Sequence, residues 1–163
     1  MQQHVAKPMM RHNVGGVMLD RPFKIQRLGH FGYNVDDTAA CCEFYSGLLG
    51  LRITDTLDLA PRAPDKLKGI AQTRAYFLNH GTDHHSFALF PKPALDILGA
   101  RSPRADMRVN QISWQVGSLR QVRDALDWLK AQGNPIHRIG RDMPGSNWHS
   151  YPFDAEGHIN ELY

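Results

Sequence analysis

The first copy of a repeated pattern is Leu28-Gly29-His30-Phe31-Gly32-Tyr33-Asn34-Val35-Asp36-Asp37. The chain contains this pattern of apolar and polar residues twice, and the repeat determines the predicted fold. The second copy is Val109-Asn110-Gln111-Ile112-Ser113-Trp114-Gln115-Val116-Gly117-Ser118, and without gaps apolar residues fall on apolar ones while His30 falls on Gln111. Each copy alternates with a period of two residues, which is typical of a half-buried strand. Each copy ends on a residue that favours a helix N-cap. The sequence therefore predicts a repeated strand-then-helix unit.

Each copy begins a longer module, which reads as β-α-β-β-β over residues 25–91 and again over residues 109–163. Residues 1–24 have no sustained period and predict an N-terminal arm, whereas 91–108, which carries three prolines, predicts a link between the modules. Neither module can bury a sheet face alone. We therefore predict one α+β domain over 25–163, with the paired modules forming a cupped half-barrel. Strands are expected at 25–35, 51–57, 73–79, 84–90, 109–116, 136–140, 147–153 and 158–163, and helices at 38–49 and from Ser118 to about Ala131.

The composition is that of an ordinary globular protein. The chain has 163 residues, of which 42% are hydrophobic and 21% charged, and its net charge is +3. The basic residues are scattered, which argues against a nucleic-acid surface, and no apolar run is long enough to span a membrane. Residues 1–26 lack the apolar core of a signal peptide. A cytoplasmic protein is expected, with Cys41 and Cys42 reduced.

Three polar side chains fall where the strand pattern predicts a concave sheet face. His30 and Gln111 lie on matching strands and point away from the predicted helices, and Glu161 lies near the end of the last strand. A lone buried carboxylate is costly, and a bound metal would offset that cost. An imidazole, an amide and a carboxylate on one concave face are similar to a facial triad with open metal positions.

Three blocks make a family resemblance specific: Leu28-Gly29-His30-Phe31, Asp83-His84-His85-Ser86-Phe87-Ala88-Leu89, and Asp154-Ala155-Glu156-Gly157-His158-Ile159-Asn160-Glu161-Leu162-Tyr163. In this order they resemble the vicinal oxygen chelate superfamily, which contains glyoxalases, bleomycin resistance proteins and extradiol dioxygenases. They look most like the catalytic domain of the extradiol dioxygenases that cleave catechols. The resemblance covers about residues 25–163.

The resemblance implies a role for each matching residue. His30 and Glu161 match two of the metal ligands, which in that family are two histidines and one glutamate around Fe(II). His85 matches the histidine beside the metal that handles protons, and Tyr151 matches a tyrosine that contacts the substrate. By strand parity His84 points away from His85 and is expected to be structural or at the surface.

Two positions depart from the family pattern. Gln111 stands where the second histidine ligand is expected, and Asp142 stands where many members have another pocket histidine. His149 could replace the missing imidazole, because it lies two residues before Tyr151 and shares its strand face. Glyoxalases of this superfamily do use glutamine as a ligand, so Gln111 could also hold a metal itself.

The resemblance implies ring cleavage of a catecholic substrate with O₂ and a divalent metal, most naturally Fe(II). The alternatives are a glyoxalase-like lyase or isomerase that uses Zn or Ni, or a binding protein without catalysis; Mn is a further candidate metal. A homodimer is expected, because cups of this superfamily commonly pair. Members often continue past the last ligand with a segment over the pocket, whereas this chain ends two residues after Glu161.

Overall fold

The computed structural model describes residues 9–99, 108–142, 146–153 and 157–163. Contacts divide the chain into two compact units. Unit 1 consists of 1–28, 113–154 and 160–163, and unit 2 of 29–112 and 155–159. The boundaries cut through the two strands that contain the repeated stretch, so each of those strands contributes to both units. No helix within the described residues is long and apolar enough to cross a membrane.

Unit 2 contains a mixed sheet in the order β4-β5-β6-β3, followed by the start of β7. β3 is parallel to β6, and β5 is antiparallel to both β4 and β6. Where β7 begins, the backbone N–H of Asn34 donates to the carbonyl of Arg108 at 2.6 Å. The elements are β3 (Ile25–Val35), α1 (Thr38–Cys42), β4 (Arg52–Asp58), β5 (Arg74–Asn79), β6 (Phe87–Pro91), α2 (Lys92–Leu98) and β7 (Val109–Val116).

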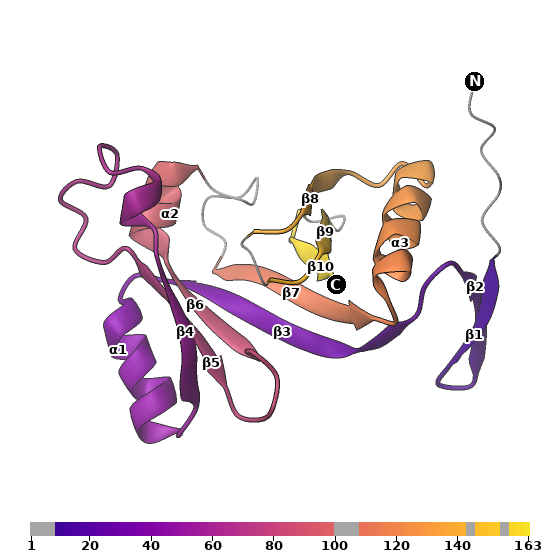
Figure 1. The fold of residues 1–163 in the computed structure, drawn as a ribbon, viewed down its shortest axis with the longest axis horizontal. Helices are drawn as coiled ribbons and strands as arrows, with labels where there is room; N and C mark the ends of the chain where they lie inside the picture. The colour runs from indigo at the N-terminus through magenta and orange to yellow at the C-terminus, as the bar shows by residue number, and fades with distance from the viewer. Residues whose placement is uncertain (1–8, 100–107, 143–145, 154–156) are drawn as a thin grey trace. The chain divides into compact units, whose positions relative to one another are not determined.

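The first predicted helix forms where the cap signal places it. The Asp37 carboxylate accepts the N–H of Ala40 at 2.9 Å, and α1 continues as π-helical turns over Glu43–Leu48. Gly50, with φ +80°, allows the chain to leave the helix in the left-handed region. In Figure 1 α1 lies beside the strands of unit 2, and it packs against β5 and β6. The core there contains buried Cys42, Leu78, Phe87 and Leu89, with Phe31, Tyr33 and Val35 from β3 packed on it.

One local expectation in unit 2 is wrong. The strand expected at 84–90 starts only at Phe87, so His84 and His85 lie in the preceding loop and strand parity does not fix their directions. The Asn79 side chain builds this loop, because it accepts from the Gly81 N–H and donates to the Asp83 carbonyl. The link between the modules also contains a helix, α2, whose proline lies in the first turn, where the missing N–H costs nothing.

Unit 1 contains the sheet order β7-β10-β9-β8 together with α3. Its further elements are β8 (Ile136–Gly140), β9 (His149–Pro152), β10 (Asn160–Leu162) and α3 (Leu119–Ala131). The Ser118 hydroxyl accepts the N–H of Gln121 at 3.3 Å, as the capping pattern predicts. Phe23, Val116, Val122, Ala125 and Leu162 form the core under α3. β1 (Met10–Val14) and β2 (Val17–Arg21) form an antiparallel hairpin that the sequence pattern does not predict.

The two sequence copies adopt the same topology. In each, the first strand lies beside the last strand of its module, then the third and then the second, which gives β3-β6-β5-β4 and β7-β10-β9-β8. The predicted pair of β-α-β-β-β repeats is therefore confirmed as the fold.

Candidate functional site

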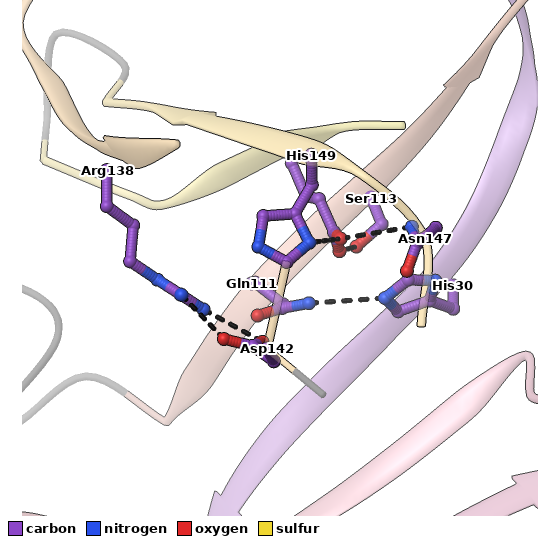
Figure 2. Close-up of polar contacts among 8 residues, drawn as sticks. His30, Gln111, Ser113, Arg138, Asp142, Asn147 and His149 are labelled. Atoms are coloured by element: carbon purple, nitrogen blue, oxygen red, sulfur yellow. Dashed lines mark hydrogen bonds and ion pairs between the residues drawn. The ribbon is translucent and has the colours of Figure 1, made fainter. Parts of the chain in front are cut away.

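His30 and Gln111 meet inside unit 2. His30 lies in β3 and Gln111 in β7, and each is only 6% exposed. Their Nε2 atoms are 3.2 Å apart, so the amide donates to the imidazole in the assigned orientation (Figure 2). The aligned strand positions of the two repeats thus bring together the two residues that the gap-free match equates.

His85 lies against His30 in the same unit. Their ring centroids are 4.2 Å apart and their planes are tilted by 55°. On another side, the Phe77 ring stands 5.0 Å from His85. His84 contacts His85 through a pair of Nδ1 atoms 2.8 Å apart. The half-buried imidazole of His85 therefore touches a candidate ligand, an apolar ring and a second imidazole.

Glu161 is the most deeply buried acidic side chain of unit 1 within the described residues, at 2% exposure. The hydroxyl of Ser113 donates to its Oε2 at 2.5 Å, and the Asn147 amide donates to its Oε1 at 3.4 Å. The Nδ1 atom of His149 is also 3.4 Å from Oε1. Hydrogen bonds to the ionised oxygens offset the cost of burying the carboxylate.

His149 and Tyr151 share a face of β9, as their spacing predicts. Their ring centroids are 4.6 Å apart, and both residues are buried. Within the part of the chain that the structure describes, the Nε2 atom of His149 is buried and accepts or donates no hydrogen bond. A buried imidazole nitrogen in this condition is costly for a protein to keep, and it is a donor atom available to a metal or a substrate.

Arg138 connects Asp142 to Tyr151. Its guanidinium forms a bidentate ion pair with Asp142, at 2.5 and 2.9 Å (Figure 2). The guanidinium also lies 4.6 Å over the Tyr151 ring. Burial alone would lower the pKa of Arg138, but Asp142 and the Tyr151 phenol outweigh that effect and raise it. Asp142 therefore serves as the anion for this arginine.

Three of these polar residues are not predicted from the sequence. Ser113 could be found, because it lies two residues after Gln111 in the same strand. Arg138 is directly opposite Tyr151 in the β8–β9 register, which requires the strand pairing to be known. Asn147 precedes β9 in a loop, where residue spacing predicts no direction.

The donor set of each unit suits a divalent transition metal. Unit 2 offers a buried imidazole beside an amide, and unit 1 offers a buried imidazole beside a carboxylate. Imidazole and carboxylate are the ligands that Fe, Mn, Zn and Ni sites use. Among the described residues no group of three or more His, Cys, Asp or Glu side chains forms a metal cluster by itself. The residues present nevertheless fit such an ion in their chemistry.

The chain is similar to proteins of known activity. It is 30% identical over 118 residues to the biphenyl-2,3-diol 1,2-dioxygenase of Paraburkholderia xenovorans, and the match covers 71% of this chain and 33% of that protein. A similar protein from Metapseudomonas furukawaii matches to the same extent. The chain thus spans about a third of the length of the curated relatives it matches.

Solved structures share the fold. The 2,2',3-trihydroxybiphenyl 1,2-dioxygenase of Sphingomonas wittichii superposes with a TM-score of 0.60 at 22% identity, covering 83% of this chain and 40% of that one. The Mn(II)-bound glyoxalase of Novosphingobium aromaticivorans gives 0.62 at 20% identity, covering 85% and 37%. Residues 27–162 match the Glyoxalase/Bleomycin resistance protein/Dioxygenase superfamily. With the repeated β-α-β-β-β topology, this match establishes that the chain belongs to the Glyoxalase/Bleomycin resistance protein/Dioxygenase superfamily.

Proposed function

We propose that this chain carries the catalytic centre of a metal-dependent, extradiol-type dioxygenase that cleaves a catecholic ring with O₂. The 30% identity to biphenyl-2,3-diol 1,2-dioxygenases supports the reaction class. The observation that carries the proposal is the burial of His30 and Glu161, two residues that would be poor choices for an apolar core. Both match ligand positions of the extradiol enzymes.

In this proposal His30 and Glu161 hold the metal, most naturally Fe(II), and Gln111 or His149 supplies the remaining protein donor. The metal would bind the two catechol oxygens and activate O₂. The chain's own contribution is to orient the metal ligands and the substrate and to exclude water from the site. Ser113 fixes one oxygen of Glu161, which leaves that carboxylate a single favoured orientation.

His85 and Tyr151 act on the substrate. The His85 ring lies against His30, so a proton held on its imidazole is within reach of a substrate oxygen bound beside that residue. Tyr151 would donate a hydrogen bond to the substrate. Arg138 holds the Tyr151 ring in place through its stacking contact.

The decisive experiment is a metal and activity assay on the full chain. We expect anaerobically purified protein to contain iron by elemental analysis and to consume O₂ with a panel of catechols, giving the coloured ring-opened products. His30→Ala and Glu161→Ala should each lose most of the metal while the far-UV circular dichroism is unchanged. The matched control is His80→Ala, which removes an exposed imidazole from the β5–β6 loop. Full metal occupancy in His30→Ala would refute the assignment.

A second candidate is a glyoxalase-like lyase or isomerase that uses Zn or Ni. Gln111 favours it, because its amide group lies against His30, the other candidate ligand. A flip that exchanges the amide oxygen and nitrogen would place the oxygen, the atom that binds metals, on the side of His30. Here Gln111→Ala should reduce zinc or nickel binding, and the protein should act on hemithioacetals rather than on catechols.

The substitution Gln111→His separates three ideas about the missing imidazole. If Gln111 is a degraded iron ligand, the histidine restores the two-His-one-carboxylate set and raises iron affinity and ring cleavage. If His149 has replaced it, Gln111→His adds little and His149→Ala releases the metal. We favour His149, because its Nε2 is buried without a hydrogen bond among the described residues. Unchanged metal binding in His149→Ala would rule this out.

A further inference from the structure

The outward side of the first helix of unit 2 carries an unusual set of residues. This helix comprises α1 and the π-helical turns that continue it to Leu48. Thr38 and Cys42 are buried on its inward side. Its outer face consists of the exposed residues Ala39, Ala40, Glu43, Phe44, Gly47, Leu48 and Leu49. Glu43 is the single charged residue in this set, all of which the structure describes.

The second sequence repeat offers an internal comparison. Its helix, α3, follows the first strand of its module as α1 does, and four of its six exposed residues are charged. These exposed residues are Leu119, Arg120, Arg123, Asp127, Lys130 and Ala131. A helix whose outward side meets water normally carries charged and polar residues there. The outward side of α3 therefore suits water, whereas the outer face of the first helix suits contact with another protein surface.

An exposed apolar side chain on the edge strand β4 extends this surface. Ile53 pairs with Leu78 of β5, and Leu78 packs in the same core as Cys42, so Ile53 lies on the helix side of the sheet. The large apolar side chains of the surface are between 43% and 75% exposed, and they are Phe44, Leu48, Leu49 and Ile53. Because a residue of this size exposes about 200 Å² in full, the four present about 400 Å², as much as patches that mark interaction sites.

The outer face is complementary to itself in the sizes of its side chains. Ala40, Phe44 and Leu48 follow one another at intervals of four residues and form one exposed row, with the small residue at its start and a large one at its end. The Glu43 carboxylate folds back over Gly47 in the neighbouring row. If two such helices cross antiparallel with their Phe44 rings side by side, Ala40 of each copy lies opposite Leu48 of the other. A small side chain then faces a large one at both ends, which is how closely packed helices interdigitate.

We propose that two copies of this chain associate through the outer face of the first helix, with the two helices antiparallel about Phe44. A two-fold axis at this contact uses the same surface on both copies. Two patches supply about 800 Å² of apolar surface, and the small residues around them extend the contact to about 1,200 Å², the lower limit for specific interfaces. A dimer of this size dissociates in the low micromolar range. The inference does not depend on the proposed reaction, because the outer face contains no residue of the candidate site.

Sedimentation of the full chain between about 0.5 and 200 µM measures the association. We expect the weight-average mass of the wild type to rise with concentration from 18.4 kDa toward twice that value. Leu48→Glu should raise the dissociation constant about tenfold or more, because it places a charge in the apolar contact. In dilute solution this variant should keep the far-UV circular dichroism and the urea midpoint of the wild type, since Leu48 is 75% exposed within its own chain.

Leu119→Glu is the matched control, because Leu119 is a 51% exposed leucine at the start of the other repeat's helix. This change should leave the dissociation constant unchanged. The double variant Ala40→Lys/Leu48→Glu tests the antiparallel register, because in that arrangement each new lysine faces the new glutamate of the other copy. It should recover most of the association that Leu48→Glu loses, and the recovery should weaken at high salt.

Four outcomes would overturn the proposal. A wild type that stays at 18.4 kDa at every concentration would assign the outer face to a partner of another kind. A dimer that Leu48→Glu leaves intact would place the contact on another surface, such as the largely exposed hairpin of β1 and β2. Equal weakening by Leu48→Glu and Leu119→Glu would show non-specific association of exposed apolar residues. A double variant that recovers no association would refute the antiparallel contact.

Discussion

Ser113 should be a strong stabilising residue, because its hydroxyl serves a buried anion. It is fully buried and donates to Oε2 of Glu161 at 2.5 Å. A hydrogen bond to a charged group contributes about 1.5–3 kcal/mol, and Ser113→Ala leaves the carboxylate short of one donor. We therefore expect Ser113→Ala to lower the free energy of unfolding by about 2 kcal/mol, or to lower Tm by about 4–8 °C for a chain of this size.

Ser150 offers an unusually close control for this change. It is 1% exposed, and within the described residues its hydroxyl has no hydrogen-bond partner. Ser150→Ala therefore removes a buried hydroxyl that forms no hydrogen bond among the described residues. The change should leave the free energy of unfolding unchanged or raise it by up to about 1 kcal/mol.

Urea unfolding of wild type and both variants, all without metal, measures the difference. A double-mutant cycle of Ser113→Ala and Glu161→Gln should show that most of the loss in free energy of unfolding caused by Ser113→Ala depends on the carboxylate. The expected coupling energy is about 1.5–3 kcal/mol. Equal losses in Ser113→Ala and Ser150→Ala would show that burial rather than the hydrogen bond determines the effect.

Three further outcomes are expected. The pKa of Asp58 is lowered by hydrogen bonds from the Thr73 hydroxyl and the Ala60 N–H, and by the charge of Arg74. Asp58→Asn should therefore destabilise the protein at pH values above about 4, and this effect should disappear as the pH falls below the folded-state pKa of Asp58. Urea unfolding at a series of pH values checks this, and a difference between the proteins that grows in acid would contradict it. Leu78→Ala should cost about 2–5 kcal/mol because that side chain is fully buried, whereas exposed Leu48→Ala should cost less than about 0.5, and equal midpoints would refute the core assignment. Sedimentation at micromolar concentration should give a dimer, and a single 18.4 kDa species would remove that proposal.

The repeat predicted most of the fold, because it combines two independent sequence signals. The period of two places Phe31, Tyr33 and Val35 on the core side of β3, and their packing confirms it. The cap residue Asp37 marks the start of α1. These signals are local, so the sequence alone contains them.

The parts that were missed carry no periodic pattern in the sequence. β1 and β2 lack a clean alternation of buried residues, because both strands of that hairpin are largely exposed. The loop with His84 and His85 is shaped by Asn79, whose side-chain bonds to Gly81 and Asp83 no periodicity encodes. The roles of His30, Gln111, His85, His149, Tyr151 and Glu161 as site residues stay predictions until metal binding and activity are measured.

The parallel pairing of β3 with β6 has a consequence for the order of folding. Phe31 pairs with Phe87, so the first strand of this module must wait for a partner 56 residues later, counting 87 minus 31. Closing such a loop costs about 3.5 kcal/mol of chain entropy before any contact rewards it. β5 and β6, in contrast, pair across a short loop and can form early. On the ribosome β3 would leave the exit tunnel well before β6 is available to pair with it. Pairing of β3 with β6 is therefore the expected slow step in the folding of this module.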